Sequence, residues 1–289
     1  MLMRSLLFMP GNNEKILSKV EEVRADAVIL DLEDGVPLDQ KEIARRMVRE
    51  RLETLDSDAL DKEVLVRVNG PGTGLGSEDC QAIVEQNLDG IMFPKVDRPE
   101  QIQHLEGILT GLADRDFTCG DEDIYFILNV ETARGIINVH ELLRASSAVA
   151  GAALGGEDLT LDIGARRTRE GDELQYSRSR LMMAAKAERQ LALDAVFVNI
   201  EDTEGLKEEA KKMSDLGFDG KLAIHPAQLG PINEAFTPAQ EEIARARRIV
   251  EAFEEAEEQG RSVASVDGEM IDPPVAARAR KLLELVEDL

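Results

Sequence analysis

The stretch AVILDLED at residues 27–34 indicates the fold class, because an apolar run broken only by Asp31 leads directly into the acidic pair Glu33 and Asp34. A run that is apolar on both faces is typical of a parallel strand covered by helices on both sides. The segment KEIARRMVRERLETL at 41–55 follows with apolar residues at helical spacing. A strand followed by such a helix predicts a βα unit of an α/β protein.

The same alternation repeats along the chain. Runs of strand length lie at 5–9, 27–32, 64–68, 90–93, 124–130, 149–154, 195–200 and 221–224. These eight βα units predict a (β/α)8 TIM barrel over residues 1–236, with the active site at the carboxyl ends of the strands. A doubly wound open sheet is the competing architecture, but no GxGxxG follows the first run and the glycine-rich loop at 70–76 contains no P-loop lysine.

Residues 237–289 depart from this alternation and form the second predicted domain. PAQEEIARARRIVEAFEEAEEQ, which begins at 238, is typical of a long amphipathic helix. GRSVASVDGEM at 260–270 predicts a loop or a short hairpin, and DPPVAARARKLLELVEDL at 272–289 predicts a closing helix. The pattern leaves three placements open for this extension: under the barrel, across to another subunit, or over the active-site mouth as a lid.

The composition excludes nucleic acid as a partner. The chain carries 58 acidic and 34 basic residues, a net charge of −24 at pH 7, whereas nucleic-acid backbones are bound by basic surfaces. Only 11 of the basic residues are lysines. An acidic surface poor in lysine predicts a halophilic protein, because high salt screens self-repulsion. An acidic face for a basic partner is the alternative.

The chain shows no signal for export or membrane insertion. Its two cysteines, Cys80 and Cys119, form no CxxC pair and cannot build a disulfide framework. The amino-terminal apolar run is too short for a signal peptide, and no stretch approaches the roughly 20 apolar residues of a spanning helix. We therefore expect a soluble, cytoplasmic protein with no membrane partner.

Two acids that close strand-like runs are candidates for a metal site. Glu131 follows ILNV at 127–130, and Asp158 follows AALGGE at 152–157. If the two strands are neighbours, the carboxylates can share a cation such as Mg²⁺, which takes oxygen ligands and leaves positions for substrate. Zinc is disfavoured because the three histidines are scattered. The alternative is that both acids are helix N-caps.

Eight ordered motifs carry a resemblance to a known family. They are RSLLFMPGNNEK at 4–15, AVILDLEDGV at 27–36, VLVRVNG at 64–70, IMFPKV at 91–96, VETARGIIN at 130–138, GGEDLTLDIGA at 155–165, GFDGKLAIHPAQL at 217–229 and VDGEMIDPP at 266–274. In this order they resemble the citrate lyase beta subunit-like family, which also contains malyl-CoA, β-methylmalyl-CoA and citramalyl-CoA lyases. The resemblance implies a (β/α)8 barrel, a homotrimer or hexamer, bound Mg²⁺ or Mn²⁺, and a coenzyme A thioester as substrate.

The implied reaction is the reversible cleavage of a 3-hydroxyacyl-CoA into acetyl-CoA or propionyl-CoA and a 2-oxo acid, glyoxylate or pyruvate. The resemblance assigns the metal to Glu131 and Asp158, where it would hold the carboxylate and adjacent oxygen of the acid. It also implies a catalytic role for Arg67, whose planar fork suits a carboxylate or enolate oxygen. A structural ion pair to Glu33 or Asp34 is the alternative for Arg67.

Asp272, in MID at 270–272, matches the family's proton donor or base, which reaches the mouth from a neighbouring subunit. From its sequence context alone, Asp272 would be a helix cap before two prolines. The rival activities are a malyl-CoA thioesterase and a citrate lyase beta-type subunit that acts on a carrier-bound thioester. The intact MID pattern favours the lyase over the thioesterase, and the complete set of catalytic residues argues against a noncatalytic subunit.

Binding of coenzyme A by so acidic a chain requires a local basic patch. Lys15 and Lys19, four residues apart on the first predicted helix, match the family's CoA-contacting lysines. The resemblance places Phe8 near the ligand and the backbone of Ile224 and His225 near the pantetheine or adenine end. Catalysis by His225 is a lesser alternative to a role in ordering the eighth loop.

The remaining polar residues near the predicted rim are expected to support the site. This set is Glu33, Asp34, Lys41 and Arg45, on the second strand and its helix, together with Lys95, which follows Pro94. We expect Lys95 to hold Glu131 or Asp158 in position, since residues that contact ligating carboxylates orient them.

Overall fold

Most of the hydrophobic runs of the sequence pair as strands in a computed structural model, which describes residues 2–55, 60–83, 88–112 and 124–287. The chain divides into two units, Met3–Asn233 and the residues from Glu234 onward together with Leu2. The division falls within helix α9 (Leu229–Phe236), near the boundary that the sequence places between residues 236 and 237.

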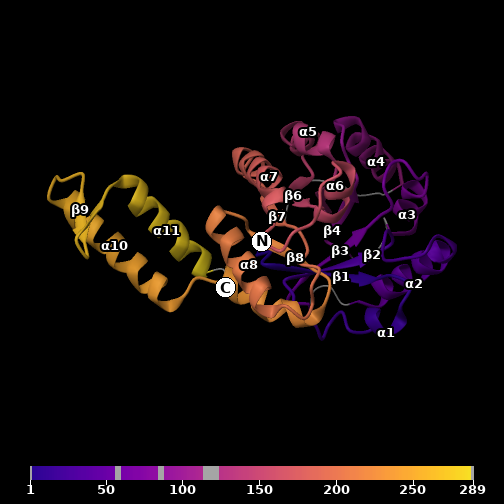
Figure 1. Ribbon diagram of the computed structural model, residues 1–289, viewed down its shortest axis with the longest axis horizontal. Helices are drawn as coiled ribbons and strands as arrows, with labels where there is room; N and C mark the ends of the chain where they lie inside the picture. Colours follow the sequence, from indigo (N-terminus) through magenta and orange to yellow (C-terminus); the bar gives the residue numbers. More distant parts are fainter. Residues whose placement is uncertain (1, 56–59, 84–87, 113–123, 288–289) are drawn as a thin grey trace. The chain divides into compact units, whose positions relative to one another are not determined.

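The first unit is a closed barrel of eight parallel strands (Figure 1). The strands are β1 (Ser5–Pro10), β2 (Ala27–Asp31), β3 (Glu63–Arg67), β4 (Gly90–Pro94), β5 (Tyr125–Val130), β6 (Val149–Leu154), β7 (Leu191–Asp194) and β8 (Gly220–Ala223). β1 closes the barrel because it pairs with β2, Leu6 opposite Ala27, and with β8, Leu6 opposite Leu222. The predicted (β/α)8 barrel is confirmed.

Helices surround the barrel (Figure 1). They are α1 (Glu14–Leu17), α2 (Lys41–Thr54), α3 (Gly76–Ile83), α4 (Pro99–Leu112), α5 (Ala133–Leu143), α6 (Gly156–Asp162), α7 (Gln175–Ala187), α8 (Thr203–Leu216) and α9, with short 3-10 turns at Leu38–Gln40, Asp172–Leu174 and Pro226–Gln228. α2 shows the general pattern, since its buried residues Ala44, Val48 and Leu52 recur every fourth position.

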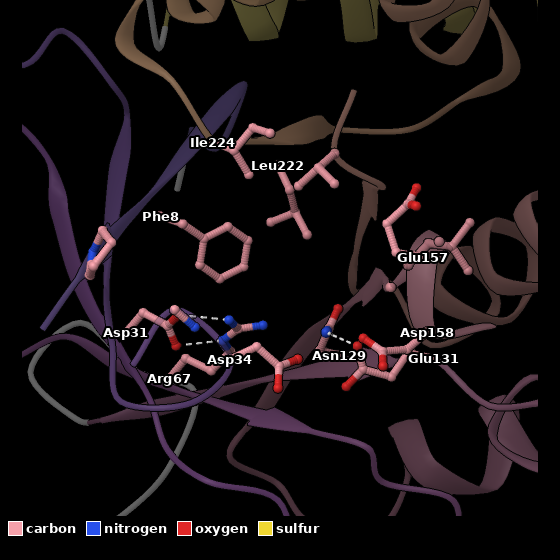
Figure 2. Close-up of a pocket in the computed structure, with 16 residues that line it drawn as sticks. Phe8, Asp31, Asp34, Arg67, Asn129, Glu131, Glu157, Asp158, Leu222 and Ile224 are labelled. Carbon is pink, nitrogen blue, oxygen red and sulfur yellow. Dashed lines mark hydrogen bonds and ion pairs between the residues drawn. The ribbon is translucent and has the colours of Figure 1, made fainter. Parts of the chain in front are cut away.

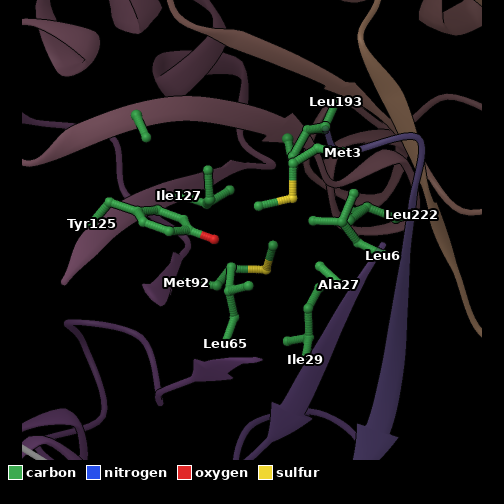
Figure 3. Packing of buried hydrophobic residues seen from close by; sticks show 12 residues of the cluster. Met3, Leu6, Ala27, Ile29, Leu65, Met92, Tyr125, Ile127, Leu193 and Leu222 are labelled. Carbon is green, nitrogen blue, oxygen red and sulfur yellow. The ribbon is translucent and has the colours of Figure 1, made fainter. Parts of the chain in front are cut away.

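Both faces of the strands are buried, as the continuous apolar runs predict. In β2, Ala27 and Ile29 belong to the cluster inside the barrel, while the alternate residues Val28 and Leu30 are also fully buried. Figure 3 shows Met3, Leu6, Ile29, Leu65, Met92 and Ile127 within this cluster. Side chains therefore fill the barrel interior, and the polar rim lies at the carboxyl ends of the strands.

The seventh strand lies earlier in the chain than the sequence predicts. β7 is Leu191–Asp194, and residues 195–200 form the loop after it. Asp194 lies in the barrel wall with no exposed surface. The protein can bury this acid because Lys221 and Arg178 donate hydrogen bonds to it at 2.5 and 2.7 Å. Those partners come from β8 and α7, so the local sequence contains no sign that an aspartate there is neutralised.

The first helix is also shorter than predicted. α1 ends at Leu17, and Lys19 lies in the turn that follows, so Lys15 and Lys19 do not share a helix face. The Ser18 hydroxyl donates to the carbonyl of Lys15 at 3.2 Å. Such a local hydrogen bond competes with continuation of the helix.

The second unit is a helix, a hairpin and a helix: α10 (Gln240–Glu258), β9 (Ala264–Val266), β10 (Glu269–Ile271) and α11 (Pro273–Glu287). Asp267 and Gly268 connect the antiparallel strands with φ angles of 53° and 82°, as a two-residue hairpin turn requires. A separate apolar cluster includes Ile249, Phe253 and Ile271. Among the described residues, no helix is both long and apolar enough to cross a membrane.

Gly220 allows β8 to approach β1, and its replacement tests the closure of the barrel. A Cβ at this position would lie 1.7 Å from the Met3 carbonyl oxygen. We expect Gly220→Ala to lower the free energy of unfolding by about 3 kcal/mol or more, because backbone must move. Gly107→Ala is the matched control: nothing lies within 4 Å of its added Cβ, and alanine inside a helix should raise stability by roughly 0.5–1 kcal/mol. Urea unfolding midpoints measure both, and equal shifts would contradict the clash.

Candidate active site

A cavity of about 330 Å³ opens at the carboxyl ends of the barrel strands. Figure 2 shows its two sides, with apolar side chains such as Phe8, Leu222 and Ile224 opposite a polar group. The polar side includes Asp31, Asp34, Arg67, Asn129, Glu131 and Asp158. The polar groups that the sequence predicts on one rim therefore form one side of a cavity whose other side is apolar.

Arg67, the last residue of β3, provides the cation of the cavity. Its Nε and Nη2 each donate to a different oxygen of Asp31 at 2.7 Å, and Nη1 lies 3.2 Å from Glu33 Oε2. Its guanidinium carbon lies 4.5 Å from the centre of the Phe8 ring. Burial disfavours the charged form, but Asp31 and Glu33 outweigh burial and raise the pKa of Arg67. Arg67 is thus a fixed cation beside an aromatic ring.

The structural ion pair considered for Arg67 is present, although Asp31 is its main partner and Glu33 its second. Asp31 is held in turn by the backbone amides of Glu33 and Gly35, which donate to its two oxygens at 2.9 and 2.8 Å. The sequence predicted no such role for Asp31. The only signal was an acid that interrupts an otherwise apolar run.

Glu131 follows β5 directly and is 2% exposed. The side-chain amide of Asn129 donates to Glu131 Oε2 at 2.6 Å, and the backbone amide of Lys95 donates to Oε1 at 2.8 Å. A Cβ on Gly155 would lie 2.3 Å from Glu131 Oε2, so only glycine fits there. Burial, and then the charges of Glu33 and Asp158, raise the pKa of Glu131 to about 8. The nearby cations Arg67 and Lys95 thus do not offset the burial of the carboxylate and its repulsion by the other acids.

Asp158 comes from the first turn of α6 and faces the same cavity. Helix α6 follows β6, which is the neighbour of β5 in the barrel, since the two strands pair along residues such as Val130 and Leu154. The charge of Asp158 contributes to the raised pKa of Glu131, so the two carboxylates interact. Glu131 and Asp158 thus follow adjacent strands and line one cavity, while their sharing of a cation stays a prediction.

Neither acid is an N-cap. α5 is capped by Thr132, whose side chain accepts from the Gly135 amide at 3.0 Å. α6 begins after Gly155, and Asp158 lies inside it. The capping alternative for Glu131 and Asp158 is therefore wrong.

The donor set fits a hard divalent cation. Glu131 and Asp158 supply carboxylate oxygens, and Asn129 Oδ1 is buried without a hydrogen-bond partner among the described residues. A cation would stabilise the ionised form of Glu131, which burial now disfavours. No group of three or more His, Cys, Asp or Glu residues with metal-binding geometry occurs in the described part of the chain. Water and substrate would supply the remaining ligands.

Lys95 connects this pair to a second pair of acids. Its ammonium lies 2.6 Å from Glu33 Oε1, 3.0 Å from Asp34 Oδ2 and 3.9 Å from Asp158 Oδ1. Burial disfavours the ammonium, but hydrogen bonds and charges of Glu33 and Asp34 raise the pKa of Lys95. The sequence-based expectation that Lys95 contacts Glu131 or Asp158 matches this geometry.

Two of the expected supporting residues, Lys41 and Arg45, are not among the residues that line the cavity. Lys41 donates to the carbonyl oxygens of Leu32 and Glu33 at 2.7 Å each, which fixes the chain after β2. Arg45 contacts Asp79 on α3 at 2.6 Å instead of joining the acids of the rim. The expected network is thus divided between the backbone after β2 and the α2–α3 contact.

The residues expected to bind coenzyme A are spread around the barrel. Phe8 and Ile224 line the cavity. His225 orders the eighth loop, since its Nδ1 accepts from the Ala227 amide at 3.2 Å. Lys15 and Lys19 are exposed and are not among the lining residues. Of this group, only Phe8 and Ile224 can touch a molecule inside the cavity.

Asp272 belongs to the second unit and caps α11. Its Oδ1 accepts from the Val275 amide at 3.1 Å, as the local sequence predicts for an aspartate before two prolines. The cap explains the residue without reference to catalysis, so its role as proton donor stays a prediction.

Asn129 was not predicted from the sequence, because an amide inside an apolar run is a weak signal.

Comparison with known proteins adds independent evidence. The model of the HpcH/HpaI aldolase/citrate lyase family matches residues 4–226. Citrate lyase subunit beta of Leuconostoc mesenteroides subsp. cremoris is 36% identical over 284 residues, 98% of this chain and 93% of that protein. The (3S)-malyl-CoA thioesterase of Cereibacter sphaeroides is 36% identical over 284 residues, 98% of this chain and 94% of that protein.

Among solved structures, protein CitE of Mycobacterium tuberculosis in complex with magnesium, acetoacetate and coenzyme A is similar to the whole chain. The TM-score is 0.80 at 33% identity, with 98% of this chain and 97% of that chain covered. The similarity therefore extends over both units of the sequence.

Glu131→Gln tests the charge balance of the cavity through the stability of the metal-free protein. The pKa of Glu131 rises on folding from 4.5 to about 8, so its contribution to stability is complete below pH 4.5 and is lost as the pH rises to 8. Glutamine cannot ionise, and we expect it to add on the order of 4 kcal/mol at pH 8. Urea unfolding in EDTA from pH 5 to 9 measures this. Parallel curves for the two proteins would contradict the raised pKa.

Proposed function

The chain belongs to the HpcH/HpaI aldolase/citrate lyase family, and from this premise we propose that it is a Mg²⁺-dependent carbon–carbon lyase. Its proposed substrate is a 3-hydroxyacyl-CoA: malyl-CoA, β-methylmalyl-CoA or citramalyl-CoA. Cleavage yields acetyl-CoA or propionyl-CoA and a 2-oxo acid, glyoxylate or pyruvate. The observation that carries the proposal is the placement of Arg67 and the Glu131–Asp158 pair in one cavity.

Glu131 and Asp158 would hold the cation, with the side-chain oxygen of Asn129, Oδ1, beside them. Bound there, Mg²⁺ would supply Lewis-acid polarisation of the oxygen that becomes the carbonyl of the 2-oxo acid. The similar CitE structure contains magnesium, acetoacetate and coenzyme A, which supports the same cofactor and thioester class for this chain. Mn²⁺ satisfies the same oxygen donors.

Arg67 is suited to bind the carboxylate of the acid or the enolate oxygen of the thioester. Asp31 fixes the plane of the guanidinium through two hydrogen bonds, so its orientation is set before substrate arrives. The Phe8 ring covers the guanidinium, and Leu222 and Ile224 stand on the same side of the cavity (Figure 2). This apolar side can receive the acyl carbons while the polar side receives the acid.

In the cleavage direction, the bond between C2 and C3 breaks and its electrons pass to the thioester enolate. The C3 hydroxyl loses its proton, and C2 gains one. We assign the proton transfer at C2 to the Asp272 carboxyl group, contributed by a neighbouring subunit of a homotrimer or hexamer. Lys15 in α1 and Lys19 in the turn after it, which are both exposed, are assigned to the phosphates of coenzyme A.

The (3S)-malyl-CoA thioesterase is the second candidate, since that relative and the citrate lyase subunit beta are each 36% identical to the chain. Overall identity therefore does not separate the two reactions. A subunit that acts on a carrier-bound thioester is the third candidate. All three would use the same cation and the same arginine.

Product analysis separates these reactions. Purified protein in high salt with Mg²⁺ should convert one or more of malyl-CoA, β-methylmalyl-CoA and citramalyl-CoA into acyl-CoA and an equal amount of 2-oxo acid, and EDTA should stop the reaction. Chromatography of the CoA species together with a 2-oxo acid assay measures this. Free CoA without a 2-oxo acid would identify a thioesterase, and turnover of only carrier-bound thioesters would identify a complex subunit.

Asp272→Asn separates catalysis from capping. Asparagine keeps an oxygen for the Val275 amide, so α11 remains capped, but it cannot transfer a proton. We expect C–C cleavage to fall by about 10²–10⁴-fold while Mg²⁺ affinity and thermal stability stay unchanged. Asp272→Ser, another capping residue without acid function, is the second variant. Full cleavage by either variant would remove Asp272 from the mechanism.

A further inference from the structure

Lys95 contacts four carboxylates that form two pairs, Glu131–Asp158 and Glu33–Asp34. Its backbone amide donates to Glu131 Oε1 at 2.8 Å. Its ammonium lies 2.6 Å from Glu33, 3.0 Å from Asp34 and 3.9 Å from Asp158. Each pair consists of one buried and one more exposed acid, so both offer a divalent cation similar oxygen donors.

The backbone of Lys95 is held in an uncommon conformation. Its φ is 54°, in the left-handed region that residues with a Cβ rarely adopt. This conformation lets the main chain and the side chain of one residue serve different acids. The amide points to Glu131, and the ammonium reaches Glu33 and Asp34.

The Glu33–Asp34 pair also has room beside it. A second cavity of about 410 Å³ is lined by Glu33, Asp34 and Lys95 and shares Asp34 with the catalytic cavity. Arg67 is already bound to Asp31 through two hydrogen bonds and lies 3.2 Å from only one oxygen of Glu33. The ammonium of Lys95 is thus the cation that occupies the space between Glu33 and Asp34.

We propose that Lys95 is a positioning residue that confines the divalent cation to Glu131 and Asp158. It does so by occupying the competing Glu33–Asp34 pair with its ammonium while its amide orients Glu131. The inference rests on the metal site of the proposed function. The proposed confinement depends on the positive charge of the Lys95 ammonium. Removal of that charge should therefore change the number of bound cations, whereas removal of a purely structural lysine would not.

The test counts Mn²⁺ ions bound to the full chain by calorimetry and by electron paramagnetic resonance of free Mn²⁺. The wild type should bind one Mn²⁺ ion per chain, and Lys95→Met should bind two. Lys95→Gln is a second neutral variant in case Lys95→Met fails to fold. Lys95→Arg keeps the charge and should bind one ion. Lys186→Met is the matched control, because Lys186 is similarly exposed and contacts Asp219 at 2.5 Å.

The outcomes are distinct. Two ions in both neutral variants and one in Lys95→Arg and Lys186→Met would support the inference. One ion in a folded neutral variant, with affinity unchanged within twofold, would overturn it even if the wild type binds metal as proposed. No ion in the wild type would instead remove the metal site of the proposed function, and the inference with it.

Discussion

The buried carboxylate of Glu131 is the constraint around which the mouth of the barrel is arranged. An acid that is 2% exposed and lies among other acids is costly to ionise. Its two hydrogen bonds come from an amide side chain and a backbone amide, neither of which carries a charge. Gly155 leaves the space that the carboxylate needs. A cation bound beside Glu131, as proposed, would balance this charge.

A second buried cluster in the barrel wall shows what a balanced arrangement looks like. Asp194 contacts Lys221 at 2.5 Å and Arg178 at 2.7 Å, and Glu209 contacts both cations. Burial raises the pKa of Asp194, but the two cations outweigh burial and lower it. Near Glu131 the balance is reversed, and the pKa is raised to about 8. The two clusters therefore differ in the direction of the shift because they differ in the number of cations near the buried acid.

The two units of the chain divide the proposed chemistry. The barrel contains the proposed cation ligands, Arg67 and the apolar side of the cavity. The second unit has its own apolar cluster and presents Asp272 directly after the hairpin strand β10. Capping of α11 fixes that side chain, and a fixed acid is what proton transfer at a defined carbon requires. Structural and catalytic roles for Asp272 are thus compatible.

Local sequence was sufficient wherever a signal depends on neighbouring residues alone. The apolar runs predicted the strands, because burial on both faces leaves a continuous pattern, and only the seventh was misplaced. The end of each run predicted the rim, including Arg67, Glu131 and Asp158, and the two prolines predicted the cap at Asp272. The hairpin was one of two options that the sequence left open.

Tertiary structure alone decided the features that depend on partners distant in the chain. Asp194 lies inside a strand because Lys221 and Arg178, from other elements, neutralise it. Asp31 was the main partner of Arg67 because β2 and β3 place the two residues opposite each other. The contacts of Lys95 with acids that follow three other strands likewise arise from barrel closure. Charge compensation acts through space, so no local pattern in the sequence records it.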